Sequence, residues 1–295
     1  MKVLFIFNPM SGVVQIKNQL LNIINIFSKA GYDLTIHATQ SQNDALCITR
    51  DRACEFDMIV CSGGDGTLNE IVNGLLVTDS RPLLGYIPSG STNDYATSLK
   101  LPRNMQKAAE LIVDGIGIPY DMGKFNDKYF VYVAAFGAFT SVSYNTPQET
   151  KNLIGHLAYV FEGLKSVGNI KDYKMHIKSD ELEFDESFIY GMITNSLSVG
   201  GLYNMSRNNV MLDDGLFEVM LIRTPKSALN LSSISSYLLG IDTSSPFVEV
   251  FKTKKISFVT NEKIPWTIDG EYGGSLNDIV IEVVNKPLNI ISLKK

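Results

Sequence analysis

The sequence predicts two domains: an N-terminal α/β domain with a doubly wound, mostly parallel sheet, and a C-terminal antiparallel β-sandwich domain. Residues 1–122 alternate short apolar runs with segments of helical periodicity, which is typical of a parallel sheet covered by helices. From residue 123 to about 286, many short alternating strands indicate an antiparallel sandwich or barrel. The chain has 295 residues, 45% of them hydrophobic, which is enough for two cores.

The parallel strands of the first domain are expected where the sequence is continuously apolar, because such strands are buried on both faces. The helices between them are expected where apolar residues recur at helical spacing, as Leu20, Ile23, Ile24 and Phe27 do. The expected strands are 2–7, 33–39, 57–64 and 83–88, and the expected helices are 15–29, 43–54, 68–76 and 105–114, with Gly115 as a cap.

In the second domain the strands are expected where apolar and polar residues alternate. The final apolar segment, about residues 287–295, is expected to return to the first domain as a strand. Helices are expected at about 150–167 and about 227–239. The expected strands are 128–137, 173–179, 182–196, 216–224, 254–260, 265–272 and 278–284.

Composition and charge exclude several classes of protein. Residues 1–122 hold 9 basic and 12 acidic residues, and the rest of the chain holds 17 and 19, so neither half is basic and nucleic-acid binding is disfavoured. We interpret Cys47, Cys54 and Cys61 as buried thiols of a reducing compartment. The apolar run at the N-terminus is too short for the core of a signal peptide, and no stretch is a credible membrane span. We therefore expect a cytoplasmic protein.

The stretch SGGDGTLNEIVNG at 62–74 joins a predicted strand to a predicted helix. Gly63, Gly64 and Gly66 would let backbone N–H groups approach an anion at the start of a helix, which suits phosphate. Asp65 in such a site makes sense if it shares Mg²⁺ with a nucleotide. The alternative is a simple glycine turn with Asp65 as a helix cap.

Five motifs occur in one order along the chain: NPMSG at 8–12, GGDGTLNEIVNG at 63–74, GYIPSGSTNDYA at 85–96, LDDGLFE at 212–218 and DGEYGG at 269–274. GGDGT is shared by 6-phosphofructokinases, NAD kinases and lipid kinases with a diacylglycerol kinase catalytic domain. The set as a whole resembles the soluble bacterial diacylglycerol kinases.

That resemblance implies roles for individual residues. Asp65, Asp94 and Glu271 would form the acidic network around a catalytic Mg²⁺, with Glu271 as the base that accepts the lipid hydroxyl proton. A second, structural Mg²⁺ would be bound by the Asp214 side chain and the carbonyl groups of Met211 and Leu216. The ATP site would be lined by Asn8, Pro9, Met10, Ser11, Gly12, Thr39, Gly63, Gly64, Asp65, Gly66, Thr67, Leu68, Asn69, Glu70 and Ser91.

Each role has a structural alternative. Asp94 could cap the helix after Ser91, Asp213 and Asp214 could form an ordinary turn, and Glu271 could be a solvated turn carboxylate. The chain also departs from the family pattern. The first basic residue after Gly12 is Lys17, which puts charge compensation of the phosphates in doubt. Ser91 stands where the family has Thr, and Tyr95 and Thr97 stand where Phe and Arg are common.

The resemblance implies an ATP-dependent kinase that phosphorylates diacylglycerol to phosphatidic acid. The alternatives are another lipid acceptor (a polyprenol, a sphingoid base or phosphatidylglycerol), a catalytically silent nucleotide-binding regulator, and a soluble-metabolite kinase. With a lipid substrate, we expect transient contact with the inner face of the cell membrane. Lys252, Lys254 and Lys255 could make that contact or simply solvate a strand edge. A homodimer is the default expectation for the assembly.

Overall fold

We analysed a computed structural model, which describes residues 1–12, 16–137, 170–196 and 210–293. The helix expected at about 150–167 lies outside these residues. The chain divides into two compact units, and each is described by itself. Unit 1 comprises residues 1–122 and 285–295, and unit 2 comprises residues 123–284.

Unit 1 is built on a parallel sheet in which β1 pairs with β2 and β3, and β3 pairs with β4. The last part of β13 joins the sheet in parallel beside β4, through Ile290 opposite Leu84. The strand order is therefore β2-β1-β3-β4-β13. These strands are β1 (Lys2–Phe7), β2 (Asp33–Ala38), β3 (Met58–Gly63), β4 (Leu83–Pro88) and β13 (Glu271–Ser292).

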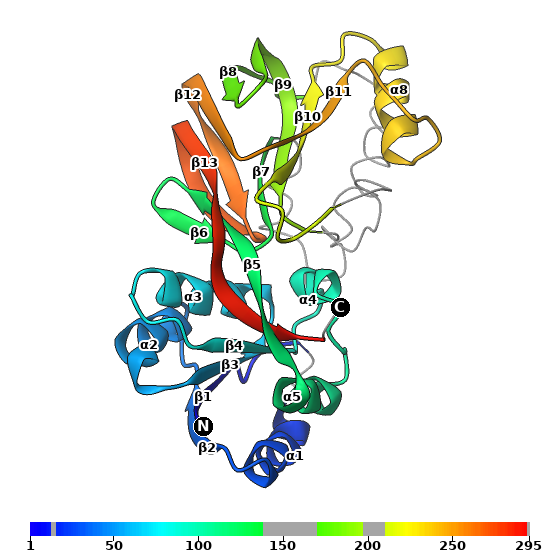
Figure 1. Ribbon diagram of the computed structural model, residues 1–295. Coiled ribbons are helices and arrows are strands. Elements are labelled where there is room, and N and C mark those ends of the chain that lie inside the picture. The colour runs from blue at the N-terminus through cyan, green and yellow to red at the C-terminus, as the bar shows by residue number, and fades with distance from the viewer. Residues whose placement is uncertain (13–15, 138–169, 197–209, 294–295) are drawn as a thin grey trace. The chain divides into compact units, whose positions relative to one another are not determined.

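The helices of unit 1 pack in two pairs, α1 with α5 and α2 with α3, and Figure 1 shows the pairs on opposite sides of the sheet. Their apolar residues are buried, as Ile23 and Phe27 of α1 illustrate. Gly115 is the C-terminal cap of α5, and its N–H donates to the Leu111 carbonyl. The bounds are α1 (Ile16–Lys29), α2 (Asp44–Arg52) with a 3₁₀ turn at Ala53–Glu55, α3 (Asp65–Leu76), α4 (Asp94–Ser98) and α5 (Met105–Asp114).

Unit 2 is an antiparallel β structure. Strand β8 pairs with both β9 and β12, and β7 pairs with the other halves of the same two strands, so the strands fold around one core. The strands β10 and β11 extend from β9. The bounds are β6 (Lys128–Phe130), β7 (Val133–Gly137), β8 (Tyr173–Ser179), β9 (Glu183–Thr194), β10 (Phe217–Arg223), α8 (Ala228–Leu238), β11 (Val248–Thr253) and β12 (Lys255–Ile268).

The core of unit 2 is aromatic. Trp266 and Phe136 are fully buried with ring centroids 4.8 Å apart, and Phe258 and Phe125 pack against the indole at 5.1 Å. Edge and tilted contacts of this kind stabilise a core beyond the area that they bury. Trp266 and Phe136 are therefore core residues.

Several sequence predictions are wrong in detail. Residues 265–272 form a hairpin, because β12 ends at Ile268 and β13 begins at Glu271. The strands β5 (Ile116–Phe125) and β11 were not predicted. Cys47 and Cys54 are exposed on α2 and the turn after it, so only Cys61 is a buried thiol.

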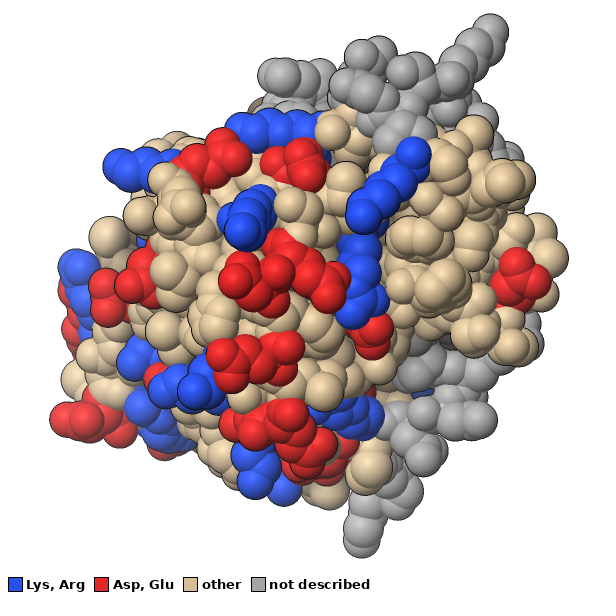
Figure 2. Space-filling view, turned by 90° about the horizontal axis from the view of Figure 1, so that it is seen from above, with Lys and Arg blue, Asp and Glu red and all other residues tan. Residues whose placement is uncertain are grey.

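Charged side chains of both signs are interspersed on the face shown in Figure 2. Unit 2 contains ion pairs of this mixed kind. Arg223 lies 2.5 Å from Glu186 and 2.7 Å from Glu249, and Lys255 lies 3.4 Å from Glu282. Each exposed pair contributes at most about 1 kcal/mol to stability.

Candidate active site

Three loops of unit 1 start at the same edge of the parallel sheet. The register pairs Phe7 with Ser62 and Gly63 with Pro88, so β1, β3 and β4 end side by side. The Asn8 N–H donates to Ser62 at 2.9 Å, and the Ser89 N–H donates to Gly63 at 2.9 Å, which continues the alignment past the strand ends. We call the loops at 8–12, 64–66 and 89–93 the glycine corner.

The loops of the glycine corner touch backbone to backbone, and glycine is what allows it. A Cβ on Gly12 would lie 2.3 Å from the Ser89 carbonyl oxygen, and one on Gly90 would lie 2.6 Å from the Gly64 Cα. Gly12 also has φ +59°, in the left-handed region. At these glycines the corner therefore presents peptide groups at its surface rather than side chains.

The helix α3 begins inside the corner, with Gly64 as its N-cap and Asp65 as its first residue. The first N–H groups of an α-helix have no partner within the helix, and the helix dipole places partial positive charge there. This end of α3 can therefore receive an anion such as phosphate. Glycine at the cap leaves the approach to these groups open.

Asp65 does not cap its own helix but the neighbouring one. Its carboxylate accepts from the N–H of Asp94 at 3.1 Å and from that of Tyr95 at 3.4 Å, at the start of α4. Asp94 is the first residue of α4, and only 5% of its surface is exposed. The fold thus holds two carboxylates next to a loop suited to phosphate, where a divalent cation would neutralise both.

Asn93 holds the third loop in shape, a role that the sequence did not indicate. It adopts φ +53°, its side-chain oxygen accepts from the Gly90 N–H at 2.9 Å, and its amide donates to the Gly90 carbonyl at 2.7 Å. The Tyr86 hydroxyl donates to the side-chain oxygen of Asn93 at 3.4 Å. Burial, reinforced by the Asp65 carboxylate, raises the pKa of Tyr86 well above its usual value, so the phenol stays a neutral donor.

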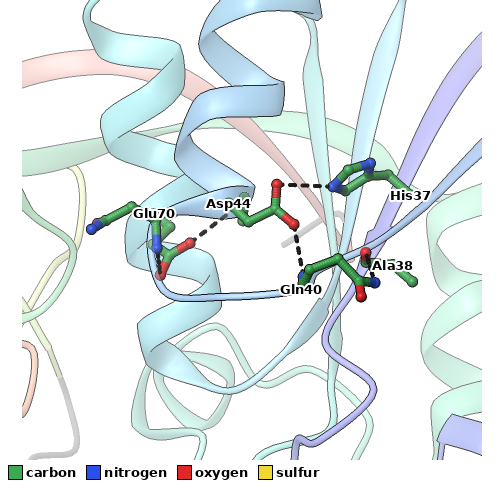
Figure 3. A network of polar contacts seen from close by, with 7 residues as sticks. His37, Ala38, Gln40, Asp44 and Glu70 are labelled. Carbon is green, nitrogen blue, oxygen red and sulfur yellow. Dashed lines mark hydrogen bonds and ion pairs between the residues drawn. The ribbon is translucent and has the colours of Figure 1, made fainter.

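The carboxylate of Glu70 contacts the start of α2 (Figure 3). Its two carboxylate oxygens accept from the N–H groups of Asn43 at 2.8 Å and Ala45 at 3.1 Å. Asp44 in turn accepts from the Gln40 N–H at 2.7 Å and pairs with His37 at 3.2 Å. The side chain of Glu70 therefore shapes the turn between β2 and α2.

Thr39 lies in that turn, at the sheet edge where the corner begins, because its N–H donates to the Phe7 carbonyl at 2.9 Å. Asn8 donates from its side chain to Thr67 at 3.4 Å and accepts from the Met10 N–H at 2.9 Å. Other members of the predicted ATP set differ in exposure. Met10 and Ser91 are exposed, whereas Leu68 is buried and could face a nucleotide only through its backbone.

Unit 2 holds the remaining predicted residues. Glu271 is exposed and is the first residue of β13, directly after the hairpin turn. Asp214 accepts from the Leu216 N–H at 3.1 Å through one oxygen and lies 3.0 Å from the Lys252 ammonium through the other. Met211, the other predicted carbonyl ligand, has an exposed side chain.

The contact between Lys252 and Asp214 was not predicted. Its ammonium also lies 3.0 Å from buried Glu218. Burial raises the pKa of Glu218 to about 6, although Lys252 opposes the shift. Lys252 and Lys255 are both paired with carboxylates, which favours the interpretation of this edge as a solvated strand rather than a lipid contact.

The surroundings of Asp214 fit a divalent cation in part. Gly215 bends the chain at φ +75° beside the Asp214 carboxylate, and a carboxylate at a bend is what an oxygen-rich divalent site needs. In this structure one Asp214 oxygen accepts from the Leu216 N–H and the other lies against the Lys252 ammonium. Within the described ranges, no cluster of three or more His, Cys, Asp or Glu side chains is arranged as a metal site. None of the helices in those ranges has the length and hydrophobicity needed to cross a bilayer.

Comparisons with known proteins agree with this geometry. Residues 2–125 match the model of the diacylglycerol kinase catalytic domain, and residues 134–292 match the YegS C-terminal NAD kinase beta sandwich-like domain. The diacylglycerol kinase of Bacillus subtilis (strain 168) is 34% identical over 273 residues, which cover 92% of this chain and 90% of that protein. The diacylglycerol kinase of Staphylococcus carnosus (strain TM300) is 32% identical over 292 residues, covering 98% and 92%.

Solved structures are similar as well. A candidate diacylglycerol kinase from Bacillus anthracis str. Sterne superimposes with a TM-score of 0.85 at 28% identity, covering 99% of this chain and 95% of that one. A crystal structure of a diacylglycerol kinase from the same organism gives a TM-score of 0.76 at 25% identity, covering 99% and 96%. Likeness over both units, together with the loops and acids of the corner, shows that the chain belongs to the diacylglycerol kinase family of lipid kinases.

Proposed function

We propose that this protein transfers the γ-phosphoryl group of ATP to the hydroxyl group of diacylglycerol, giving phosphatidic acid. The observation that carries the proposal is the glycine corner itself, where the start of α3 lies beside Asp65, whose carboxylate accepts from the backbone N–H of Asp94. Phosphoryl transfer requires positioning and charge stabilisation more than covalent chemistry from the protein. A corner of this kind suits that requirement.

In the proposed mechanism the N–H groups at the start of α3 bind the phosphates of ATP. In the loop at 8–12, Asn8, Met10 and Ser11 use their N–H groups within the protein, so this loop shapes the corner beside them. Asp65 and Asp94 would hold the catalytic Mg²⁺, which supplies neutralisation of the phosphate charge when bound. Glu271 accepts the proton of the lipid hydroxyl as its oxygen attacks the γ-phosphorus, and the bond from that phosphorus to the β-phosphate oxygen breaks to release ADP. Asp214, with the carbonyl groups of Met211 and Leu216, would hold a second Mg²⁺ with a structural role, beside Lys252.

Glu70 and Thr39 contribute in different ways. Because the Glu70 carboxylate is engaged by Asn43 and Ala45, it supports the nucleotide site by fixing the β2–α2 turn in which Thr39 lies. Leu68 supports α3 from the core. Glu70 and Leu68 would therefore hold the loops of the nucleotide site rather than touch ATP.

The acceptor is the part of the proposal that needs a direct test. We would incubate the protein with radiolabelled ATP and Mg²⁺ in mixed micelles containing diacylglycerol, a polyprenol, a sphingoid base or phosphatidylglycerol, with NAD as a soluble acceptor. Labelled phosphatidic acid is the expected product. If another lipid is labelled instead, that lipid is the acceptor. If only NAD is labelled, or nothing is, the protein is not an ATP-dependent lipid kinase.

Glu271→Gln tests the proposed base. Loss of a general base costs about 10²–10⁴-fold in rate, so we expect turnover to fall by that factor while ATP binding, measured by calorimetry, stays close to that of the unmodified protein. Retained turnover would remove Glu271 from this role. Asp278→Asn, at another exposed acid of β13, is the matched control and should turn over normally.

A further inference from the structure

The hairpin that carries Glu271 turns at Asp269 and Gly270, with φ +48° and +84°. Ile268 and Glu271 face each other across the turn as a strand pair. Two consecutive residues of positive φ are the signature of the tight hairpin turn that Asp-Gly favours. Asn would serve such a turn as well as Asp, so the turn alone does not explain a carboxylate here.

The Asp269 carboxylate is buried, with 4% of the residue exposed, and it accepts three backbone hydrogen bonds from one loop. One oxygen accepts from the N–H of Val131 at 2.7 Å. The other accepts from the N–H groups of Tyr132 and Val133, both at 3.0 Å. The Asp269 N–H returns a bond to the Val133 carbonyl at 2.9 Å, so the hairpin tip and the loop at 131–133 are tied in both directions.

The loop at 131–133 is itself fixed from its other side. The Tyr132 carbonyl accepts from the Thr194 hydroxyl at 2.6 Å and from the Asn195 N–H at 3.0 Å. The strand β7, which continues from the loop, pairs with β12 through Ala134 opposite Ile268. The hairpin tip is therefore hydrogen-bonded to a buried loop that β7 and β9 hold in place.

An exposed Glu at a hairpin tip has few contacts of its own to hold it. A general base must lie within hydrogen-bond reach of the proton that it accepts, and a displacement of about 1 Å can cost about 10²-fold in rate. Glu271 lies two residues after Asp269, on the backbone that the Asp269 carboxylate restrains. The buried Asp269 carboxylate therefore restrains the backbone that carries the exposed Glu271 carboxylate.

We propose that Asp269 is a positioning residue whose carboxylate holds the hairpin tip so that Glu271 can act as the base. The inference rests on the proposed function, in which Glu271 takes the hydroxyl proton. It assigns Asp269 no contact with substrate and no proton transfer. Its effect on catalysis passes through Glu271 alone.

Asp269→Asn is the first test, because Asn keeps the size and the turn preference but replaces one accepting oxygen with an NH₂ group. We expect kcat with the lipid acceptor to fall by about 10–100-fold with ATP affinity unchanged. A double variant with Glu271→Gln separates positioning from other roles. If Asp269 acts through Glu271, the double variant turns over no more slowly than Glu271→Gln alone.

Three results would overturn the proposal: unchanged kcat in Asp269→Asn, the same fold loss of kcat in the Glu271→Gln background, or full activity of Glu271→Gln. The last result defeats the proposed base as well, whereas the first two defeat only the positioning role. If Asp269→Asn does not fold by circular dichroism, Thr194→Val replaces it, since it removes the bond that fixes the loop from the other side. The proposal is supported if Thr194→Val lowers kcat in the unmodified protein but causes no further loss in the Glu271→Gln background. Any other result overturns it.

Discussion

Gly12→Ala probes the close packing of the glycine corner. The new Cβ would lie 2.3 Å from the Ser89 carbonyl oxygen, so the backbone of one loop must move. Alanine at φ +59° costs about 1–2 kcal/mol in backbone energy, and overpacking against backbone costs about 1–3 kcal/mol more. We expect the free energy of unfolding of unit 1 to fall by about 2–5 kcal/mol, together with weaker ATP binding.

Gly31→Ala is the matched control. Gly31 has φ +77°, but a Cβ there meets nothing within 4 Å. Only the backbone cost of about 1–2 kcal/mol applies, and ATP binding should be unchanged. Urea unfolding followed by circular dichroism gives the two stabilities, and calorimetry gives the affinities. Equal losses of stability in the two variants, or normal ATP binding by Gly12→Ala, would refute the packing described for the corner.

Three further predictions concern single side chains. Glu70→Gln removes one acceptor at the start of α2, so we expect a higher KM for ATP and a stability loss of about 0.5–2 kcal/mol; unchanged values of both would show that the turn does not depend on Glu70. For the proposed structural ion, EDTA should lower the Tm of the unmodified protein but not that of Asp214→Ala, and a Tm indifferent to EDTA in both would count against the ion. Burial raises the pKa of the Cys61 thiol, so a thiol reagent should modify two cysteines, Cys47 and Cys54, in the native protein and all three in urea; a fast third reaction in the native state would contradict the burial of Cys61.

The strands β1, β3 and β4 were predictable because their continuously apolar residues are buried on both faces. β1 and β4 have the bounds that their apolar runs predict, and β2 and β3 end within a residue or so of them. β5 was missed because Gly117 and Pro119 interrupt its apolar residues. β11 was missed because it is only partly buried and follows a segment rich in Ser.

The candidate site was predictable where the signal is local. The glycines and Asp65 stand in one motif, and the order of the motifs places them on loops. Contacts between distant residues were not readable from the sequence. Asp269 meets Val131 across 138 positions and Glu70 meets Asn43 across 27, and neither pairing follows from spacing or composition.

In the proposed function, the glycine corner binds a nucleoside triphosphate. A crystal structure with a non-hydrolysable ATP analogue and Mg²⁺ tests it most directly. We predict phosphate oxygens within hydrogen-bond distance of the N–H groups at the start of α3, with the metal ion beside Asp65 and Asp94. An analogue bound elsewhere, with the corner vacant and those two acids unengaged, would show that the corner is not the nucleotide site.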